Sequence, residues 1–237
     1  MTAAWIGFAG GVVAAVVSAI VALRQAQQSE RLETLKAELE AQRSERERDV
    51  RAEEVLARYR EPLAAAAFDL QSRLYNILRL DFFAKFGNGE RGEVALTTTL
   101  FRLAQYFGWT EILRRDIQFL SFPEDADTRR VAQLQSEIAR CFLSDRYGTA
   151  LMVWSDEQRG IGERMIVEEH GKVLCMGYAT FSDRCDDAFA PWRERLRDDL
   201  AQESAHARML DAQHLLCELV ETLDVHRVRY ARDLRRA

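Results

Sequence analysis

The sequence has little proline and no pattern of paired cysteines. Only three of its 237 residues are proline. Because proline interrupts helices and the glycines cluster in a few places, the chain is predicted to favour long helices over a many-stranded sheet. The four cysteines form no C-x-x-C pair and none of the spacings of a zinc site or disulfide scaffold: Cys141, Cys175, Cys185 and Cys217. They are therefore predicted to be reduced thiols in the core.

Several common catalytic motifs are also missing. The chain contains no G-x-S-x-G, H-E-x-x-H or G-K-[ST] segment, which lowers the expectation of the commonest hydrolase, metalloprotease and NTPase chemistries. Asp211, His214, Cys217 and Glu218 share one face of a predicted helix. However, no second cluster of His or Cys completes a coordination sphere. The sequence predicts no catalytic residues, no metal site and no cofactor.

Charge is absent from the start of the chain. The nineteen residues from Trp5 to Leu23 carry none, and a helix of that length spans about 28 Å, close to the hydrocarbon thickness of a bilayer. A cleaved signal peptide would normally have a basic segment before a shorter apolar stretch, so we expect an uncleaved anchor. Basic residues follow the stretch at Arg24 and Arg31. The positive-inside rule therefore leaves residues 1–4 outside the cell membrane and the rest of the chain in the cytoplasm.

Small residues recur within this predicted transmembrane helix. Gly7, Gly11 and Ala15 follow one another at four-residue intervals. Such rows let two helix backbones approach closely in lipid, which predicts self-association of the chain. The alternative is that they reflect only the general abundance of alanine and glycine in membrane helices.

A neutral, highly charged segment follows at residues 24–54. From Arg24 to Arg60 there are nine basic and nine acidic residues, with no glycine or proline. Oppositely charged residues four apart, such as Glu47 and Arg51, support a solvent-exposed helix that acts as a stalk. Leu32, Leu35 and Leu39 have coiled-coil spacing, but Gln42 and Arg46 occupy the next such positions. Any coiled coil is therefore predicted to be short.

The remaining residues, 55–237, are predicted to form one helical cytoplasmic domain. Apolar residues at three-to-four spacing mark a helix from Val55, a second one interrupted at Gly108, a third ending before Gly148 and a last long one from Ala201 to Arg236. A fourth helix begins at Ser155, where Ser155 and Gln158 have capping-box spacing. A short β-hairpin competes with helix near residues 165–181. The overall prediction is a mainly all-α chain that packs as an antiparallel helical bundle.

The segment from Trp154 to Arg164 is the best candidate for a ligand pocket, because hydrogen-bonding side chains alternate with two glycines that permit close approach. Its candidate lining residues are Trp154, Asp156, Glu157, Arg159 and Glu163. They could hold a polar ligand or act as acid and base. A capped helix start with solvated charges explains the same residues.

The last twelve residues, from His226, contain five arginines and one acidic residue. Such a segment can bind nucleic acid or anionic lipid. It can also complement a helix C-terminus or the acidic remainder of the chain, and this second interpretation is favoured because an acidic body discourages nucleic-acid binding.

Three short segments give a resemblance to known proteins: Tyr59-Arg60-Glu61-Pro62-Leu63, Tyr106-Phe107-Gly108-Trp109 with Glu111-Ile112-Leu113-Arg114-Arg115, and Glu157-Gln158-Arg159-Gly160-Ile161-Gly162-Glu163. With these segments the chain resembles a family of membrane-anchored bacterial proteins with a helical cytoplasmic domain, to which no activity is assigned. The resemblance covers most of the body. It implies the order of anchor, charged helix and domain, and it implies no catalytic residues.

Two functions follow from these patterns. The first is a membrane-tethered helical interaction or scaffold module that self-associates and displays its domain to a cytoplasmic protein partner. The second is a membrane-anchored enzyme or small-ligand sensor that uses residues 154–164. A deep pocket at Glu157, Arg159 and Glu163 would favour the second, and a solvated arrangement would favour the first.

Overall fold

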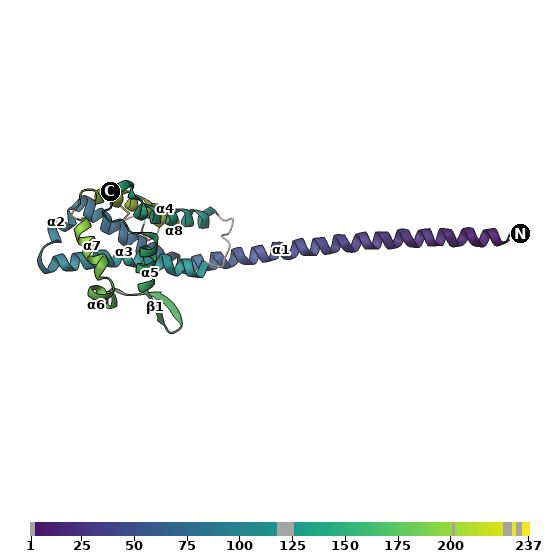
Figure 1. The fold of residues 1–237 in the computed structure, drawn as a ribbon, viewed down its shortest axis with the longest axis horizontal. Helices are drawn as coiled ribbons and strands as arrows, with labels where there is room; N and C mark the ends of the chain where they lie inside the picture. The colour runs from purple at the N-terminus through teal and green to yellow at the C-terminus, as the bar shows by residue number, and fades with distance from the viewer. Residues whose placement is uncertain (1–2, 118–125, 201, 225–228, 231–233) are drawn as a thin grey trace. The chain divides into compact units, whose positions relative to one another are not determined.

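The computed structural model describes residues 3–117, 126–200, 202–224, 229–230 and 234–237, without side chains at 3–30, 32–34, 48–49, 51–53, 55–57, 117 and 126–128. Among these residues there are nine helices and one two-stranded sheet (Figure 1). The chain divides into two compact units, residues 1–48 and 49–237. The prediction of a mainly helical chain is confirmed.

The first unit consists of the early part of helix α1 (Ala3–Leu80). Every side chain described between residues 31 and 47 is exposed, including those of Leu35 and Leu39. The predicted transmembrane segment, residues 5–23, belongs to α1, but its side chains, with Gly7, Gly11 and Ala15, lie outside the described residues. Among the residues that were described, no helix combines the length and the apolar character needed to cross a bilayer.

In the second unit, α1 is followed by α2 (Phe82–Phe86) and by α3 (Gly89–Ile117). Two hydrogen bonds fix the direction of α3 against α1. Tyr59 Oη donates to Asp116 Oδ2 at 2.6 Å, and Arg73 Nη2 donates to Thr98 Oγ1 at 3.2 Å. Because the later residue on α1 pairs with the earlier residue on α3, these two helices are antiparallel.

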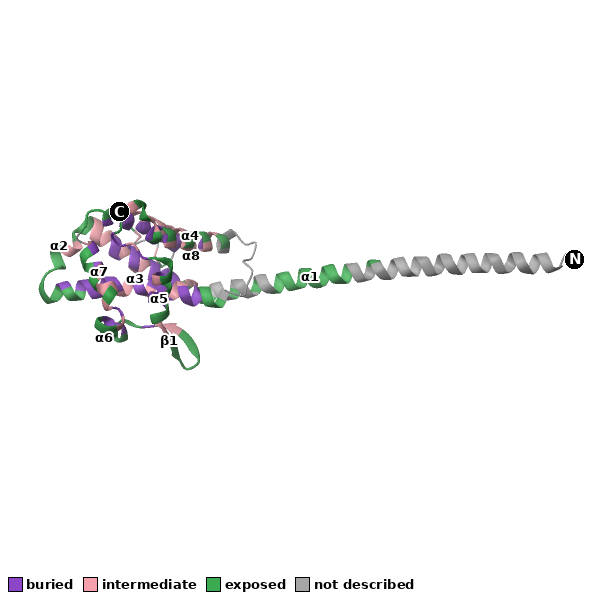
Figure 2. Cartoon of the chain, in the orientation of Figure 1, coloured by how far each residue is buried: buried purple, intermediate pink, exposed green. Residues whose placement is uncertain are grey.

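A second antiparallel pair consists of α4 (Ala126–Leu143) and α8 (Ala205–Leu223), which lie side by side in Figure 1. Arg130 Nη2 contacts Glu218 Oε2 at 2.6 Å near one end, and Arg208 Nη1 donates to the Cys141 carbonyl oxygen at 2.6 Å near the other. The predicted packing as a helical bundle is therefore confirmed. Figure 2 shows buried positions along the helices of this unit.

The elements between these pairs are short. They are the 3-10 helix η1 (Asp145–Tyr147), α5 (Ser155–Arg164), β1 (Ile166–Glu169), β2 (Lys172–Cys175), α6 (Tyr178–Ala188) and α7 (Ala190–Leu200). The strands form an antiparallel hairpin that pairs Ile166 with Cys175 and Glu169 with Lys172. His170 and Gly171 both have positive φ, 52° and 73°. Two such residues suit a tight hairpin turn. The range 165–181 therefore contains a hairpin at residues 166–175, and its last residues, from Tyr178, begin α6.

Two expected helix boundaries are wrong. α3 continues without interruption through Gly108. The helix expected from Ala201 to Arg236 ends at Leu223. At its end Asp224 is the C-cap, and its Oδ2 accepts the backbone N–H of Tyr230 at 2.9 Å. The side chain of Tyr230 then packs on Phe68 of α1, with ring centroids 5.0 Å apart.

Candidate functional site

Glu157 fixes the start of α5. Its Oε2 accepts the backbone N–H of Trp154 at 3.0 Å, and its Oε1 lies 2.9 Å from Arg195 Nη1 on α7. Partial burial raises the pKa of this carboxyl, but the Arg195 guanidinium and the Trp154 N–H outweigh burial, so that the pKa lies below its ordinary value. The capping pair is therefore Trp154 with Glu157, one residue earlier than the predicted pair of Ser155 with Gln158.

The other four candidate residues face solvent. Trp154 is 60% exposed, and the side chains of Asp156, Arg159 and Glu163 are 98%, 57% and 53% exposed. The face that α5 buries consists instead of Gln158, Ile161 and Gly162. The five candidate residues thus do not converge on a common cavity, and their charges are arranged around the outside of a short capped helix.

The buried face of α5 meets α3 at a glycine. A Cβ added at Gly162 would lie 2.6 Å from the Phe107 carbonyl oxygen and 2.9 Å from Glu111 Cβ. The sequence suggested that Gly160 and Gly162 allow a ligand to approach closely. At Gly162 the space is instead used by the packing of α5 on α3. At Gly160 an added Cβ would meet nothing within 4 Å.

A buried carboxylate, that of Glu111, lies at the same contact between α3 and α5. Glu111 has a side chain only 3% exposed, and it accepts hydrogen bonds from Arg114 Nε at 2.7 Å and Arg115 Nε at 2.8 Å. Arg115 also contacts Glu163 Oε1 on α5 at 3.1 Å. Burial raises the pKa of Glu111, but the two guanidinium groups lower it further, so that the net pKa is below the ordinary value. Glu163 is thus part of an ion-pair network between two helices.

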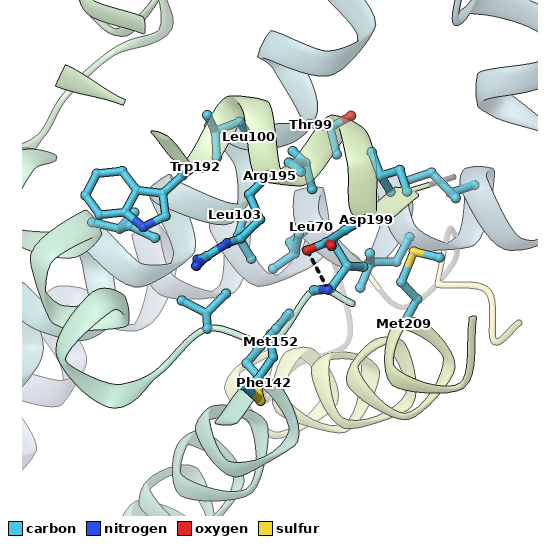
Figure 3. Close-up of a pocket in the computed structure, with 17 residues that line it drawn as sticks. Leu70, Thr99, Leu100, Leu103, Phe142, Met152, Trp192, Arg195, Asp199 and Met209 are labelled. Atoms are coloured by element: carbon cyan, nitrogen blue, oxygen red, sulfur yellow. Dashed lines mark hydrogen bonds between the residues drawn. The ribbon is translucent and has the colours of Figure 1, made fainter. Parts of the chain in front are cut away.

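An apolar cavity of about 40 Å³ lies inside the second unit, between α1, α3, α7 and α8 (Figure 3). Its walls include Leu70, Leu100, Trp192 and Met209. None of the five candidate residues of α5 lines it. Engineered cavities that bind benzene measure about 150 Å³. The space inside the core is therefore a packing defect and too small for an organic ligand.

Arg208 is a fully buried cation on α8, with 0% exposure. Its guanidinium donates to four carbonyl oxygens: Cys141 at 2.6 Å, Phe142 at 2.9 Å, Gly148 at 2.7 Å and Ala150 at 2.9 Å. The first two belong to the last turn of α4, where a helix carries partial negative charge. Arg208 thus caps α4 and holds the connection to α5, and nothing in the spacing of the sequence distinguishes it from a surface arginine.

Asp199 on α7 supports the same connection. Its Oδ2 accepts the backbone N–H of Leu151 at 2.8 Å, the contact drawn as a dashed line in Figure 3. Leu151 has a positive φ of 55°. A branched residue rarely adopts this conformation, so the Asp199 hydrogen bond offsets part of its strain.

All four thiols are free. Cys141, Cys185 and Cys217 are buried and Cys175 is partly so. Burial raises the pKa of Cys141 and Cys217 to about 11 and that of Cys175 to about 12. Because the thiolate is the reactive form, thiols with such pKa values are poor nucleophiles at neutral pH.

The acidic residues near His214 have partners other than a metal. Asp211 pairs with Arg146 and Tyr147, and Glu218 pairs with Arg130. Within the part of the chain that the structure describes, no group of three or more His, Cys, Asp or Glu side chains is suitably placed to hold a metal ion.

The described residues of the basic C-terminal segment contact α1 and α8. Arg236 Nη2 contacts Glu221 Oε2 at 3.0 Å, and Arg229 pairs with Glu61 of α1. Gln213 on α8 holds the backbone of the segment, since its Nε2 donates to the Arg235 carbonyl oxygen at 2.6 Å and its Oε1 accepts the Ala237 N–H at 3.1 Å. Two of the five arginines therefore complement acidic residues of the same chain.

Comparison of the chain with protein-family models, with curated proteins and with solved structures finds no match.

Proposed function

We propose that this chain is a membrane-tethered helical module that associates with itself and displays its domain, residues 55–237, to a cytoplasmic protein partner. The observation that carries the proposal is a pair of exposed leucines on α1. Leu35 is 53% exposed and Leu39 is 51% exposed. They lie four residues apart and therefore share one face of the helix. A leucine pair on one face of an otherwise charged helix is typical of a short coiled-coil contact.

The proposed binding partner of this leucine face is a second copy of the chain. An anchor at residues 5–23 would hold two copies parallel in one membrane, and the small residues Gly7, Gly11 and Ala15 would let the anchors pack. Parallel packing places Leu35 and Leu39 of one copy at the level of the same residues of the other. Segment 24–60 has no net charge, so two copies do not repel each other.

The domain also exposes apolar side chains that a protein partner could cover. Leu80 is 43% exposed, Phe86 is 42% exposed and Val94 is 57% exposed. Leu80 is the last residue of α1, Phe86 is the last residue of α2, and Val94 lies near the start of α3. Together they provide apolar contact area outside the self-association face, which supports the display of the domain to another protein.

The proposal is tested by sedimentation of the full chain in detergent micelles. We expect the wild type to sediment as a dimer and the double variant Leu35→Glu/Leu39→Glu to dissociate about tenfold more readily, which corresponds to about 1.4 kcal/mol. The matched control is Ala37→Glu/Ala41→Glu, which adds the same charge at exposed positions on another face of α1. A monomeric wild type, or equal weakening by both double variants, would overturn the proposal.

A further inference from the structure

A second cavity, of about 200 Å³, lies where the C-terminal segment meets α1. It is lined by Phe68, Gln71, Ser72, Tyr75 and Asn76 of α1 and by Arg235. It is open to solvent on one side, and its space is larger than the volume of about 150 Å³ that holds benzene in enclosed engineered cavities. A small organic molecule therefore fits in it, unlike in the cavity inside the core.

One lining group has an unmet hydrogen bond. Gln71 is only 1% exposed, and its Oε1 accepts a hydrogen bond from Gln213 Nε2 at 3.0 Å. The Nε2 of Gln71 is buried and has no hydrogen-bond partner among the described residues. A buried amide donor without an acceptor is unfavourable, so this atom favours a ligand that brings an acceptor into the cavity.

Arg235 adds a positive charge that no carboxylate of the described residues neutralises within ion-pair distance. Its neighbour Arg236 pairs with Glu221. Gln213 fixes the backbone of Arg235 through the 2.6 Å hydrogen bond to its carbonyl oxygen. Arg235 therefore lines the cavity with its backbone held in place.

The remaining lining groups complement an anion with an apolar body. Ser72, Tyr75 and Asn76 can donate hydrogen bonds, and the aromatic ring of Phe68 forms an apolar wall. The six lining residues include no carboxylate. We infer that this cavity binds a small organic anion, whose carboxylate or phosphate group contacts Arg235 and the free amide of Gln71.

The inference is tested by isothermal titration of the full chain in detergent micelles with two probes, benzoate and phenyl phosphate. We expect at least one probe to bind saturably, and the better probe identifies the acidic group. Arg235→Gln should weaken its binding about tenfold or more. The matched control Arg236→Gln, which removes the same charge from the next residue, should leave the affinity unchanged.

A second variant distinguishes binding inside the cavity from attraction by positive charge alone. Ser72→Phe fills the space without changing charge and should abolish binding, and circular dichroism confirms that the variant remains folded. Benzyl alcohol, a neutral molecule of similar size, should bind far more weakly than either anion. The inference is overturned if neither anion binds, if benzyl alcohol binds equally well, or if Arg235→Gln and Arg236→Gln have the same effect.

Discussion

Gly162 of α5 lies against the backbone of Phe107 on α3, so closely that an added Cβ would stand 2.6 Å from the Phe107 carbonyl oxygen. Backbone cannot move aside as the end of a flexible side chain can. Any larger residue at Gly162 therefore has to separate the two helices, and with them the ion pair between Arg115 and Glu163.

This contact predicts opposite effects for two glycines of one helix. Gly162→Ala should lower the free energy of unfolding by about 1–3 kcal/mol, because it overpacks the contact between α3 and α5. Gly160→Ala should raise it by about 0.5–1 kcal/mol, because alanine is the better helix former and the position is open. Urea unfolding monitored by tryptophan fluorescence measures both. Similar effects of the two substitutions would show that the close approach is absent.

Arg208→Met should destabilise the second unit by about 3 kcal/mol. The substitution keeps much of the side-chain volume but leaves four carbonyl oxygens without their donor, and three of these hydrogen bonds are buried. Arg159→Met, at a side chain 57% exposed, is the control and should change stability by less than about 0.5 kcal/mol. Urea unfolding measures both variants. If the free energy of unfolding fell no more for Arg208→Met than for Arg159→Met, the role of Arg208 as a cap would be contradicted.

The lowered pKa of Glu111 predicts a pH dependence of stability. Its folded carboxylate binds a proton less tightly than that of the unfolded chain, where the pKa is about 4.3. The stabilisation is therefore complete above that value and is lost as the pH falls through the lower folded pKa. Glu111→Gln should lower stability at neutral pH and flatten its decline in acid.

The measurement is a series of urea unfolding curves from neutral to acid pH. Glu90→Gln, at an exposed position, serves as the matched control and should keep the slope of the wild type. If Glu111→Gln also kept that slope, the network of Glu111 with Arg114 and Arg115 would not contribute to the pH dependence.

The four thiols should resist modification while the chain is folded. At about pH 8, the thiols of Cys141, Cys175 and Cys217, with pKa values near 11 or 12, are almost entirely protonated. Burial also raises the pKa of the Cys185 thiol. We expect a colourimetric disulfide reagent to label the cysteines only after denaturation. Ser182→Cys, which adds a thiol at an exposed position of α6, should react at once. Rapid labelling of the wild type would contradict the burial of these side chains.

The proposed anchor predicts that the full chain stays in the membrane pellet after alkaline carbonate extraction, while a variant lacking residues 5–23 is released. Orientation is tested with a membrane-impermeant maleimide on intact cells. Thr2→Cys should be labelled, and Ser182→Cys should be labelled only after lysis. Release of the full chain by carbonate would overturn the anchor, and the reverse labelling pattern would overturn the orientation.

Periodicity in the sequence was sufficient to predict the mainly helical fold. The capping-box spacing of Ser155 and Gln158 predicted the helix there, and a hairpin was predicted to compete with helix near residues 165–181. It failed at Gly108, because a glycine required for close packing has the same appearance in a sequence as one that ends a helix. It also failed at Leu223, where the helix ends through the hydrogen bond from the Tyr230 N–H to Asp224. The sequence pattern does not specify that bond.

The candidate site was harder to predict than the fold. The polar side chains of residues 154–164 suggested a pocket, but Glu157 caps a helix and Glu163 belongs to an ion-pair network. The lining of the cavity at Arg235 combines α1 with a segment about 160 residues later in the chain. Only tertiary packing brings such residues together.

The connection between α4 and α5 has a consequence for the order of folding. Its conformation depends on Arg208 and on Asp199, which are 58 and 48 residues away from the atoms they bind. Contacts between residues this far apart in the chain require loop-closure entropy before they stabilise the fold. We therefore expect the strained backbone at Leu151 to become native together with the docking of α7 and α8.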